Sequence, residues 1–371
     1  MIICSPQLGI NPKSVLGGEV FDRKILLGLA KKKVKIKIIL PKGKAHDKKI
    51  KNWQITFIPI THFPAILFNL IIVPYLFSIY RKEKFSIIRL HQPQFMGFAG
   101  LFFKLFHRDV KLVATYHQFR ESSFGPFSKI VNNLWDHIIC DSLAVKRKIV
   151  KLYKLPENKI SIVHNGVPSY LKPSTKDRNY LKKYNLQDKI VLLFMGLFIE
   201  RKNPLFLLDV LFKLSKTRSD LVLVYWGKGP LKTKIIQKAK KLHLSNQVRI
   251  IDPVFGPQKN KIHNLADIFV HPAINEGFAL APLEAMACAK PIVISSAYSA
   301  KEAVTQGING FLCRVNDLGN WQDHLSELIE DSTLRDKMGK ASVQKVKKEF
   351  QWSIAADIHF KIFKNLLHEN I

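Results

Sequence analysis

Cysteine is scarce in this chain, and no two cysteines stand close together. The four cysteines, Cys4, Cys140, Cys288 and Cys313, form no CxxC pair. A zinc ribbon needs such closely spaced pairs, and a small disulfide scaffold needs many more cysteines. The sequence therefore excludes both classes, and its isolated cysteines suit a reducing compartment.

Acidic residues are also few. The chain has 28 Asp and Glu residues against 59 Lys and Arg residues, which gives a formal charge of +31 spread over 371 residues. Such a field attracts phosphates, whether they belong to nucleic acid, anionic lipid headgroups or nucleotide substrates. A lysine-rich surface inherited from biased codon usage explains the charge equally well. Charge alone therefore does not identify the partner.

No secretion signal is visible, and only one long stretch lacks charge. The strand-like run at residues 2–4 comes first, without a basic region or a long apolar region before it. Residues 52–80 contain no Lys, Arg, Asp or Glu, and residues 63–80 are strongly apolar, although Pro64 and Pro74 interrupt them. A spanning helix needs about 20 predominantly apolar residues in a row. We expect a buried helix here; a helix at a membrane surface and a membrane span are the alternatives.

The overall composition is that of a globular protein. Apolar residues make up 47% of the chain and charged residues 23%, which excludes general disorder. A length of 371 residues exceeds the roughly 250–300 residues over which one hydrophobic core keeps growing. We therefore expect two domains.

Short apolar runs alternate with longer amphipathic runs along both halves of the chain. Before a polar, turn-rich segment at residues 169–179, strands are predicted at residues 34–40, 53–58, 86–90, 111–116, 137–140 and 159–164, and a helix at 19–31. After it, strands are predicted at residues 190–195, 221–226, 248–251, 268–271 and 291–295, and helices at 204–214, 231–242, 260–265, 283–289 and 352–367. Strands separated by helices predict parallel sheets built from crossover units.

The domain organisation follows from this repeated pattern. We predict an α/β fold with two doubly wound domains, at residues 1–170 and 171–350, and a C-terminal helix at 351–371 that packs back toward the first domain. Two such domains would place a ligand cleft between the carboxyl ends of their strands.

The most informative motif lies in residues 266–295. A strand that ends at His271 is followed by a loop with Glu276, and Pro282 opens a helix that carries Glu284. Proline suits a first helical turn, and the exposed amides there favour an anion. The two glutamates have seven residues between them, one on the loop and one on the helix. Both can therefore face one ligand, with one carboxylate for sugar hydroxyls and the other for a ribose diol. An ordinary loop with a solvent-facing helix carboxylate is the alternative.

This segment resembles the retaining glycosyltransferases of family 4, in which glutamates at this spacing mark the donor site. The resemblance implies a GT-B fold, with two Rossmann-like domains that face a central cleft. It implies a catalytic role for Glu276 and donor binding by the positions that follow it. These donor-binding positions are Gly277, Phe278, Ala279, Leu280 and Glu284.

A basic pair follows the first strand of the second half. Gly196 is followed six residues on by Lys202, just before a helix, as in the family. The resemblance implies that Lys202 neutralises the donor diphosphate and that Arg201 adds a planar fork of donors. Solvated surface is the alternative for both. The run Gly227-Lys228-Gly229-Pro230 is similar to the family's turn near the nucleotide, and a plain turn explains it equally well.

The first half offers weaker matches. Gly17 and Gly18 open the first long helix and resemble the family's glycine loop, which implies contact with donor phosphates and acceptor. His117 ends a predicted strand and matches a family position implicated in catalysis. His91 ends the preceding strand and is its competitor for that role.

Three departures from the family leave the donor open. Many members have Arg where this chain has Leu197, and a glycine pair where it has residues 298–302. Asp252 stands where a glycine is common, near the expected base pocket.

The expected activity is transfer of a hexose from a nucleoside diphosphate sugar, UDP rather than GDP, to a hydroxyl of a glycan or lipid-linked acceptor, with retention of configuration. No two aspartates flank one residue, so the metal-binding DXD signature is absent and we expect neither metal nor cofactor. Arg201, Lys202 and helix amides would stabilise the leaving diphosphate instead. We expect a cytoplasmic protein, either free or peripheral at the inner face of an anionic membrane.

Three other functions stay open. The architecture is shared by non-hydrolysing nucleotide-sugar 2-epimerases. The charge of +31 would suit a nucleic-acid-binding protein, although the chain has no zinc finger, aromatic RNA-binding signature or concentrated basic helix, so no specific nucleic acid is expected. A catalytically inactive scaffold is the third.

Overall fold

The computed structural model describes residues 1–14, 16–60, 67–91, 93, 96–117, 127–297 and 299–368. The chain forms two compact units. Unit 1 comprises Met1–Asn165 together with Trp352–Ile371, and unit 2 comprises Gly166–Gln351. The chain thus passes from unit 1 to unit 2 after Asn165, shortly before the domain boundary predicted at residue 170. The C-terminal helix belongs to unit 1. Residues 61–66 of the uncharged stretch and Tyr298 lie outside the described residues.

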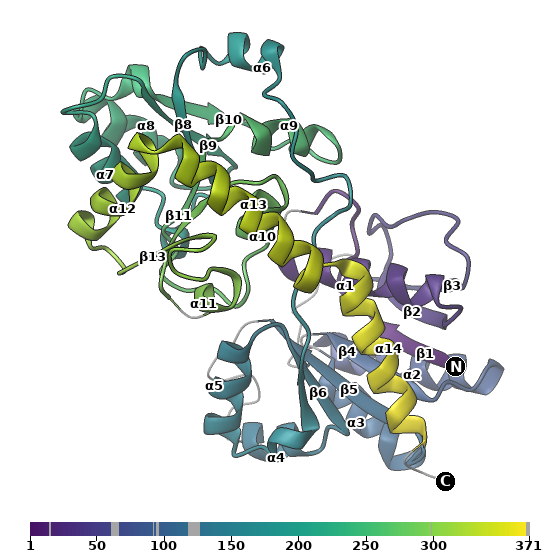
Figure 1. The fold of residues 1–371 in the computed structure, drawn as a ribbon. Helices are drawn as coiled ribbons and strands as arrows, with labels where there is room; N and C mark the ends of the chain where they lie inside the picture. Colours follow the sequence, from purple (N-terminus) through teal and green to yellow (C-terminus); the bar gives the residue numbers. More distant parts are fainter. Residues whose placement is uncertain are drawn as a thin grey trace. The chain divides into compact units, whose positions relative to one another are not determined.

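Unit 1 is built on a parallel sheet of seven strands in the order β3-β2-β1-β4-β5-β6-β7 (Figure 1). The strands are β1 (Ile2–Pro6), β2 (Lys35–Pro41), β3 (Trp53–Ile58), β4 (Ile87–His91), β5 (Lys111–Tyr116), β6 (His137–Cys140) and β7 (Ile160–Ile162). The helices are α1 (Gly17–Lys31), α2 (Phe68–Lys82), α3 (Gly97–Phe106), α4 (Ser128–Asn133), α5 (Leu143–Tyr153), the 3₁₀ turn η4 (Glu157–Lys159) and α14 (Trp352–His368).

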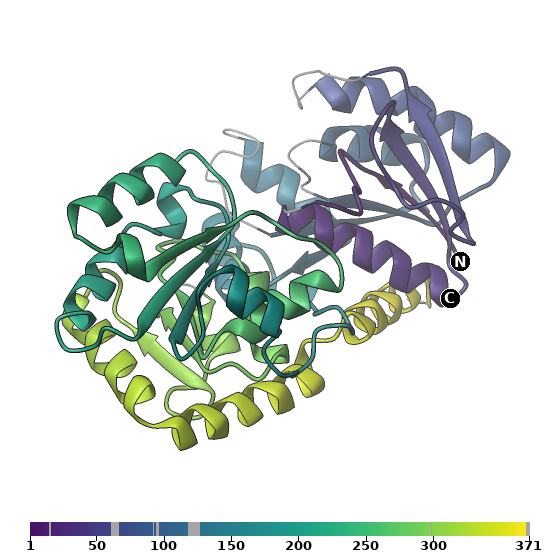
Figure 2. The same ribbon diagram turned by 90° about the horizontal axis from the view of Figure 1, so that it is seen from above.

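Helices cover both faces of this sheet, which explains why its strands are apolar runs rather than alternating patterns. On one face α2, α3, α4 and α5 contribute to one hydrophobic core, represented by Ile72, Phe103, Val131 and Ile149. On the other face α1 and α14 share a second core and lie side by side (Figure 2). The direction of strand order reverses between β1 and β4, where ligands bind in open α/β sheets.

Unit 2 is a second parallel α/β unit, with six strands in the order β10-β9-β8-β11-β12-β13. The strands are β8 (Ile190–Met195), β9 (Leu221–Trp226), β10 (Val248–Ile251), β11 (Ile268–His271), β12 (Ile292–Ser295) and β13 (Gly310–Cys313). The helices are α6 (Arg178–Lys183), η5 (Glu200–Lys202), α7 (Phe206–Leu214), α8 (Lys232–Lys241), η6 (Ser245–Gln247), α9 (Gln258–Leu265), α10 (Leu280–Ala287), α11 (Ala300–Ala303), α12 (Leu318–Glu330) and α13 (Ser332–Glu349). Two hydrophobic cores again flank the sheet. The prediction of two Rossmann-like, doubly wound units is confirmed.

Helix α2 accounts for nearly all of the described part of the apolar segment at residues 63–80. Its residues Phe68, Ile72, Leu76 and Ile79 are buried against the sheet, and Pro74 lies inside it. Among the described residues, no helix combines the length and the apolar character that crossing a membrane would need. The prediction of a buried helix therefore fits residues 68–80.

The close contact of α1 with α14 gives a test of the packing in unit 1. A Cβ atom added at Gly28 would lie 2.4 Å from the Cβ atom of Ala356. In an unobstructed helix, replacing Gly by Ala gains about 1 kcal/mol. We expect Gly28→Ala instead to lower the free energy of unfolding by about 1–3 kcal/mol, because the helices must separate.

Urea denaturation measures this effect. The double variant Gly28→Ala/Ala356→Gly moves the methyl group from one helix to the other and should recover much of the loss. A Gly28→Ala variant as stable as the parent protein would contradict the described packing.

Candidate active site

The predicted basic pair and the predicted loop glutamate meet in unit 2. Arg201 and Lys202 lie in the 3₁₀ turn η5, which follows β8, and Glu276 lies in the loop after β11. Nη1 of Arg201 donates to Oε1 of Glu276 at 2.7 Å. Nζ of Lys202 forms an ion pair with the same oxygen. Two neighbouring cations therefore share one carboxylate oxygen.

Backbone contacts hold this basic turn in place. The amide of Phe198 donates to the carbonyl of Lys228 at 2.9 Å, so the loop after β8 lies against the Gly227–Pro230 turn after β9. A Cβ atom at Gly227 would lie 1.9 Å from the carbonyl oxygen of Gly196, so only glycine fits there. The amide of Ile274 donates to the carbonyl of Arg201 at 2.9 Å and connects the basic turn to the loop of Glu276. The Gly227–Pro230 turn thus has a structural role.

Glu276 uses only one of its two oxygens. Both cations contact Oε1, and Oε2 accepts no hydrogen bond from a described residue. Burial lowers the pKa of Lys202, and the carboxylate of Glu276 opposes that effect. The carboxylate is therefore oriented by the cations while its second oxygen stays free to accept hydrogen bonds.

Glu284 shows the same arrangement with different partners. It lies on α10 and is 5% exposed. Its Oε2 forms an ion pair with Nζ of Lys259 and lies 3.5 Å from Nε2 of His263, whose pKa is lowered by burial; both residues are on α9. Burial raises the pKa of Glu284, but Lys259 and His263 outweigh it and lower the pKa below its usual value. Its Oε1 accepts no hydrogen bond from a residue in the described part of the chain. The two glutamates share no partner.

Helix α10 begins earlier than predicted. It starts at Leu280, so Pro282 lies within its first turn rather than opening it. Amides throughout a first turn have no partner within the helix, so proline is tolerated at each of these positions. Ala279 is the N-cap residue, and the amides of the predicted donor-binding loop lead directly into the helix.

Sequence analysis missed the residues that hold Glu284. Lys259 and His263 lie on one face of α9, and Nζ of Lys259 also lies 5.3 Å from the centre of the Trp226 ring at the end of β9. The i, i+4 spacing of Lys259 and His263 was their only signal, and it is common on surface helices.

A pocket lies at the carboxyl ends of β11 and β12. It is lined by His271, Ala273, Glu276, Phe278, Ala279, Pro282, Ile294, Ser295, Ala297, Ser299, Ala300 and Ala303. His271 and Ser295 are buried, and neither the His271 ring nitrogens nor the Ser295 hydroxyl has a hydrogen-bond partner within the described chain. Burial, with Lys202 and Arg201 nearby, holds the pKa of His271 well below its usual value, so this ring is neutral at pH 7. Buried polar groups without partners are rare, and here they surround a pocket.

Phe278 has a second role that the sequence did not show. Its side chain is 6% exposed and packs against Phe350 in the core of unit 2, with ring centres 5.6 Å apart. It anchors the loop as well as lining the pocket.

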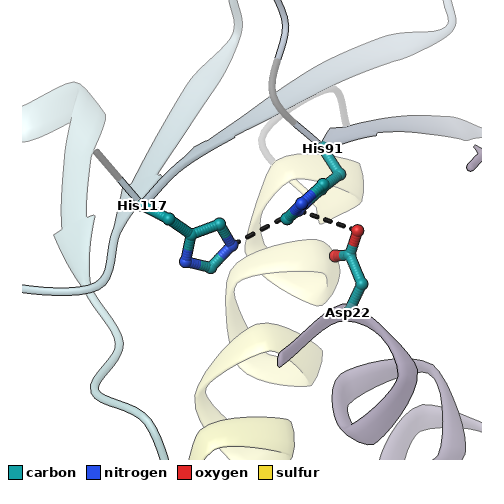
Figure 3. A group of neighbouring side chains, drawn as sticks. All are labelled: Asp22, His91 and His117. Carbon is teal, nitrogen blue, oxygen red and sulfur yellow. Dashed lines mark hydrogen bonds and ion pairs between the residues drawn. The ribbon is translucent and has the colours of Figure 1, made fainter. Parts of the chain in front are cut away.

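In unit 1 the two candidate histidines meet a carboxylate (Figure 3). His91 ends β4, His117 follows β5, and Asp22 lies on α1. Nδ1 of His91 is 2.7 Å from Oδ2 of Asp22, and Nε2 of His117 is 3.3 Å from Nδ1 of His91. Asp22 also forms an ion pair with the buried Arg89. Sequence analysis missed both Asp22 and Arg89, which lie within regular elements.

The protonation states in this cluster follow from its burial and charges. Burial raises the pKa of Asp22, but Arg89 and His91 more than offset this and bring it to about 2. Burial lowers the pKa of His91 to about 4 despite Asp22. At pH 7 the neutral His91 therefore donates its Nδ1–H to the ionised Asp22. We assign the proton of His117 to Nδ1, which is 3.3 Å from Oδ2 of Asp141.

The same three residues could in principle hold a metal ion. One donor atom each from Asp22, His91 and His117 lies within 4.8 Å of the others. Arg89 already neutralises Asp22, however, and a divalent cation would stand beside that buried guanidinium. We therefore assign the cluster to hydrogen bonding.

Gly17 and Gly18 stand at the start of the same helix. Helix α1 begins at Gly17, one turn before Asp22. In its first turn, Oε1 of Glu19 accepts a hydrogen bond from the amide of Asn11 at 2.6 Å. The glycines thus lie where the loop after β1 meets α1, in the unit that holds His117.

Comparison with known proteins connects both units to one group of enzymes. Residues 176–345 match the family described as "Glycosyl transferases group 1", and residues 16–169 match "Glycosyltransferase Family 4". A D-inositol 3-phosphate glycosyltransferase of Streptosporangium roseum is 28% identical over 252 residues, which cover 63% of this chain and 57% of the relative. The chain thus spans a little over half the length of that curated relative.

Two further similarities cover nearly the whole chain. An uncharacterized glycosyltransferase of Methanocaldococcus jannaschii is 24% identical over 357 residues, covering 89% of this chain and 88% of the relative. The Anabaena protein HepE, solved in complex with UDP and glucose, has a TM-score of 0.80 at 17% identity, covering 98% of this chain and 100% of that one. This similarity in fold, together with the two parallel sheets, places the present chain in the GT-B class. The chain belongs to glycosyltransferase family 4.

The buried histidines of unit 1 predict acid sensitivity. The pKa of His91 is about 4 and that of His359, on α14, about 3, both because burial disfavours the charged ring. In the unfolded chain these rings take up a proton near pH 6.5. We therefore expect the free energy of unfolding to fall as pH decreases from about 6.5 toward 4, by up to about 1.4 kcal/mol per pH unit for each ring.

Urea unfolding at several pH values measures this slope. His359→Asn removes one titrating ring, and its amide can still donate to the carbonyl of Ala355, the partner of Nδ1 at 2.9 Å. The slope between pH 6.5 and 4.5 should become shallower. An unchanged slope would show that His359 does not stay neutral in the folded protein.

Proposed function

We propose that this protein is a retaining glycosyltransferase that transfers a hexose from a nucleoside diphosphate sugar to a hydroxyl group of a glycan or lipid-linked acceptor. The observation that carries the proposal is how the carboxylate oxygens of the paired glutamates are held. In both Glu276 and Glu284 one oxygen is held by a cation, and the other accepts no hydrogen bond from a described residue. Oriented carboxylate oxygens are suited to accept hydrogen bonds from hydroxyl groups.

The sugar of the donor fits the pocket beside Glu276. His271, neutral at pH 7, offers one donor and one acceptor, and the Ser295 hydroxyl offers both. A hexose carries several hydroxyl groups that would satisfy these buried atoms together with Oε2 of Glu276. The small side chains of Ala273, Ala279 and the other lining alanines leave room for a ring.

The diphosphate of the donor would lie at the basic turn. Negative charge develops on the nucleoside diphosphate as the glycosidic bond breaks, and fixed cations stabilise it. Arg201 offers a fork of donors and Lys202 a compact charge, both already oriented by Glu276. The amides at the start of α10 would add a partial positive charge. We propose that these groups act without a metal ion.

The ribose would lie at Glu284, with its diol donating to Oε1. The complex of the Anabaena protein with UDP and glucose makes UDP-glucose the first donor to test. GDP-sugars are the second choice, since the departures at Leu197 and Asp252 leave the base open.

His117 is our candidate for a catalytic residue in unit 1. It is 9% exposed and follows β5 at the carboxyl edge of the sheet. Among the described residues, its Nε2 has only the 3.3 Å contact with His91, which is longer than the 2.7 Å contact between His91 and Asp22. We propose that a substrate hydroxyl replaces this weaker contact. Gly17 and Gly18, at the start of α1, are the proposed loop for phosphate or acceptor.

The acceptor is proposed to lie at a membrane surface. The formal charge of +31 favours anionic lipid headgroups, which suits a lipid-linked acceptor at the inner face of a membrane.

Turnover of the donor tests the assignment of the basic turn and of Glu284. Lys202→Ala and Glu284→Ala should each lower kcat/KM about 10²- to 10³-fold, the range found when one transition-state contact is removed. UDP release from UDP-glucose measures the rate. The control is Lys228→Ala, which removes an exposed lysine from the neighbouring turn and should leave the rate unchanged. Parent-like kcat/KM in both site variants would remove the assignment.

Thermal unfolding with nucleotide sugars tests binding without catalysis. A ligand present at 100 times its Kd stabilises the folded protein by about 2.7 kcal/mol. We expect UDP-glucose to raise the Tm of the parent protein, and Glu284→Ala to shrink that shift. If GDP-sugars raise the Tm and UDP-sugars do not, the proposed base is wrong.

A further inference from the structure

Helix α3 carries large apolar side chains on its outer side as well as its inner side. Phe103 is fully buried in the core of unit 1. On the opposite side Phe102, Leu105 and Phe106 are 47%, 71% and 63% exposed. A helix that is apolar all round is normally covered on every side. We therefore expect a binding partner to cover the outer side of α3.

Helix α4 repeats this pattern. Phe127, at its N-cap, is 62% exposed, Ile130 63% and Leu134 51%, whereas Val131 is buried. Positions 127, 130 and 134 follow one another at i, i+3 and i+7, so they form one stripe along the helix.

The two stripes belong to one layer of the fold. Phe103 of α3 and Val131 of α4 contribute to the same hydrophobic core, on the same face of the sheet. The helices follow β4 and β5, which are neighbours in the sheet (Figure 1). Their outer sides thus face away from the sheet together. We call this surface the apolar face; it comprises Phe102, Leu105, Phe106, Phe127, Ile130 and Leu134.

Positive charge borders the apolar face. Residues 127–154, which span α4 and α5, contain six Lys and Arg residues and two aspartates. Neither aspartate offers a free exposed charge, since Asp136 forms an ion pair with Lys104 and Asp141 is buried. Lys129, Arg147 and Lys151 are exposed. Arg108, just beyond the end of α3, is exposed as well.

We propose that the apolar face docks onto the surface of an anionic lipid bilayer, with α3 and α4 lying in the plane of the membrane. Apolar side chains would enter the boundary between headgroups and acyl chains, and the bordering cations would contact lipid phosphates. A second copy of this chain is a poor occupant, because it brings another +31 charges to the same surface. The proposal deepens the membrane-surface acceptor proposed above by assigning the contact to a defined face, and it needs no catalysis.

Co-sedimentation with lipid vesicles tests the proposal on the full-length protein. The parent should bind phosphatidylcholine vesicles that contain phosphatidylglycerol, and added salt should weaken that binding. Phe102→Ser/Phe106→Ser should reduce binding about tenfold or more, because two buried rings are lost from the bilayer boundary. The matched control Phe212→Ser/Phe255→Ser changes two exposed phenylalanines of unit 2, which are 37% and 41% exposed, and should bind like the parent.

Three results would overturn the proposal. The first is parent protein that does not bind anionic vesicles, and the second is a Phe102→Ser/Phe106→Ser variant that binds them as well as the parent does. The third is a dimer in analytical ultracentrifugation that this variant dissociates, which would assign the face to self-association. Failure of the glycosyltransferase proposal would appear instead as absent donor turnover with vesicle binding intact.

Discussion

The carboxylate of Glu276 is the interaction on which the proposed donor site depends. Arg201 and Lys202 are adjacent in sequence and repel each other, and the single negative charge of Glu276 offsets part of that repulsion, which leaves the cluster with a net positive charge. This cluster joins the loops after β8 and β11, two neighbouring strands whose carboxyl ends lie at one edge of the sheet. It fixes the direction in which the cations point and leaves Oε2 of Glu276 for a ligand. In the proposed donor site, one ion cluster would thereby prepare an anion site and a hydroxyl site together.

In unit 1 an ion pair also orients a neighbouring side chain, and this pair is more deeply buried than the one in unit 2. The pair of Asp22 and Arg89 is fully buried, and its carboxylate orients His91, which in turn contacts His117. A buried pair contributes little net stability, because desolvation offsets the attraction, but loss of one partner leaves a costly unpaired charge. Such pairs are therefore suited to fixing geometry. In both units a charged pair near the carboxyl edge of a parallel sheet orients residues that are proposed to contact substrate.

Much of the fold could be predicted from the sequence because buried parallel strands are apolar runs. Strands β3, β5, β6, β8, β9, β10 and β11 have the predicted bounds. Strand β13 was missed, since Gly310 and the short run after it resemble a turn. At the site, the spacing of Glu276 and Glu284 and the position of Lys202 were visible in the sequence. The partners Lys259, His263, Asp22 and Arg89 were not, because only tertiary structure brings a helix face or a strand interior to a distant carboxylate. The exposure of Phe102 and Phe106 was hidden for the same reason.

The most direct test of the account is a crystal structure of the protein with a non-hydrolysable UDP-sugar analogue. The account predicts the diphosphate at Arg201 and Lys202, a sugar hydroxyl within hydrogen-bond distance of Oε2 of Glu276, and the ribose at Oε1 of Glu284. A nucleotide bound away from these residues, or glutamates whose free oxygens both point away from the ligand, would contradict it.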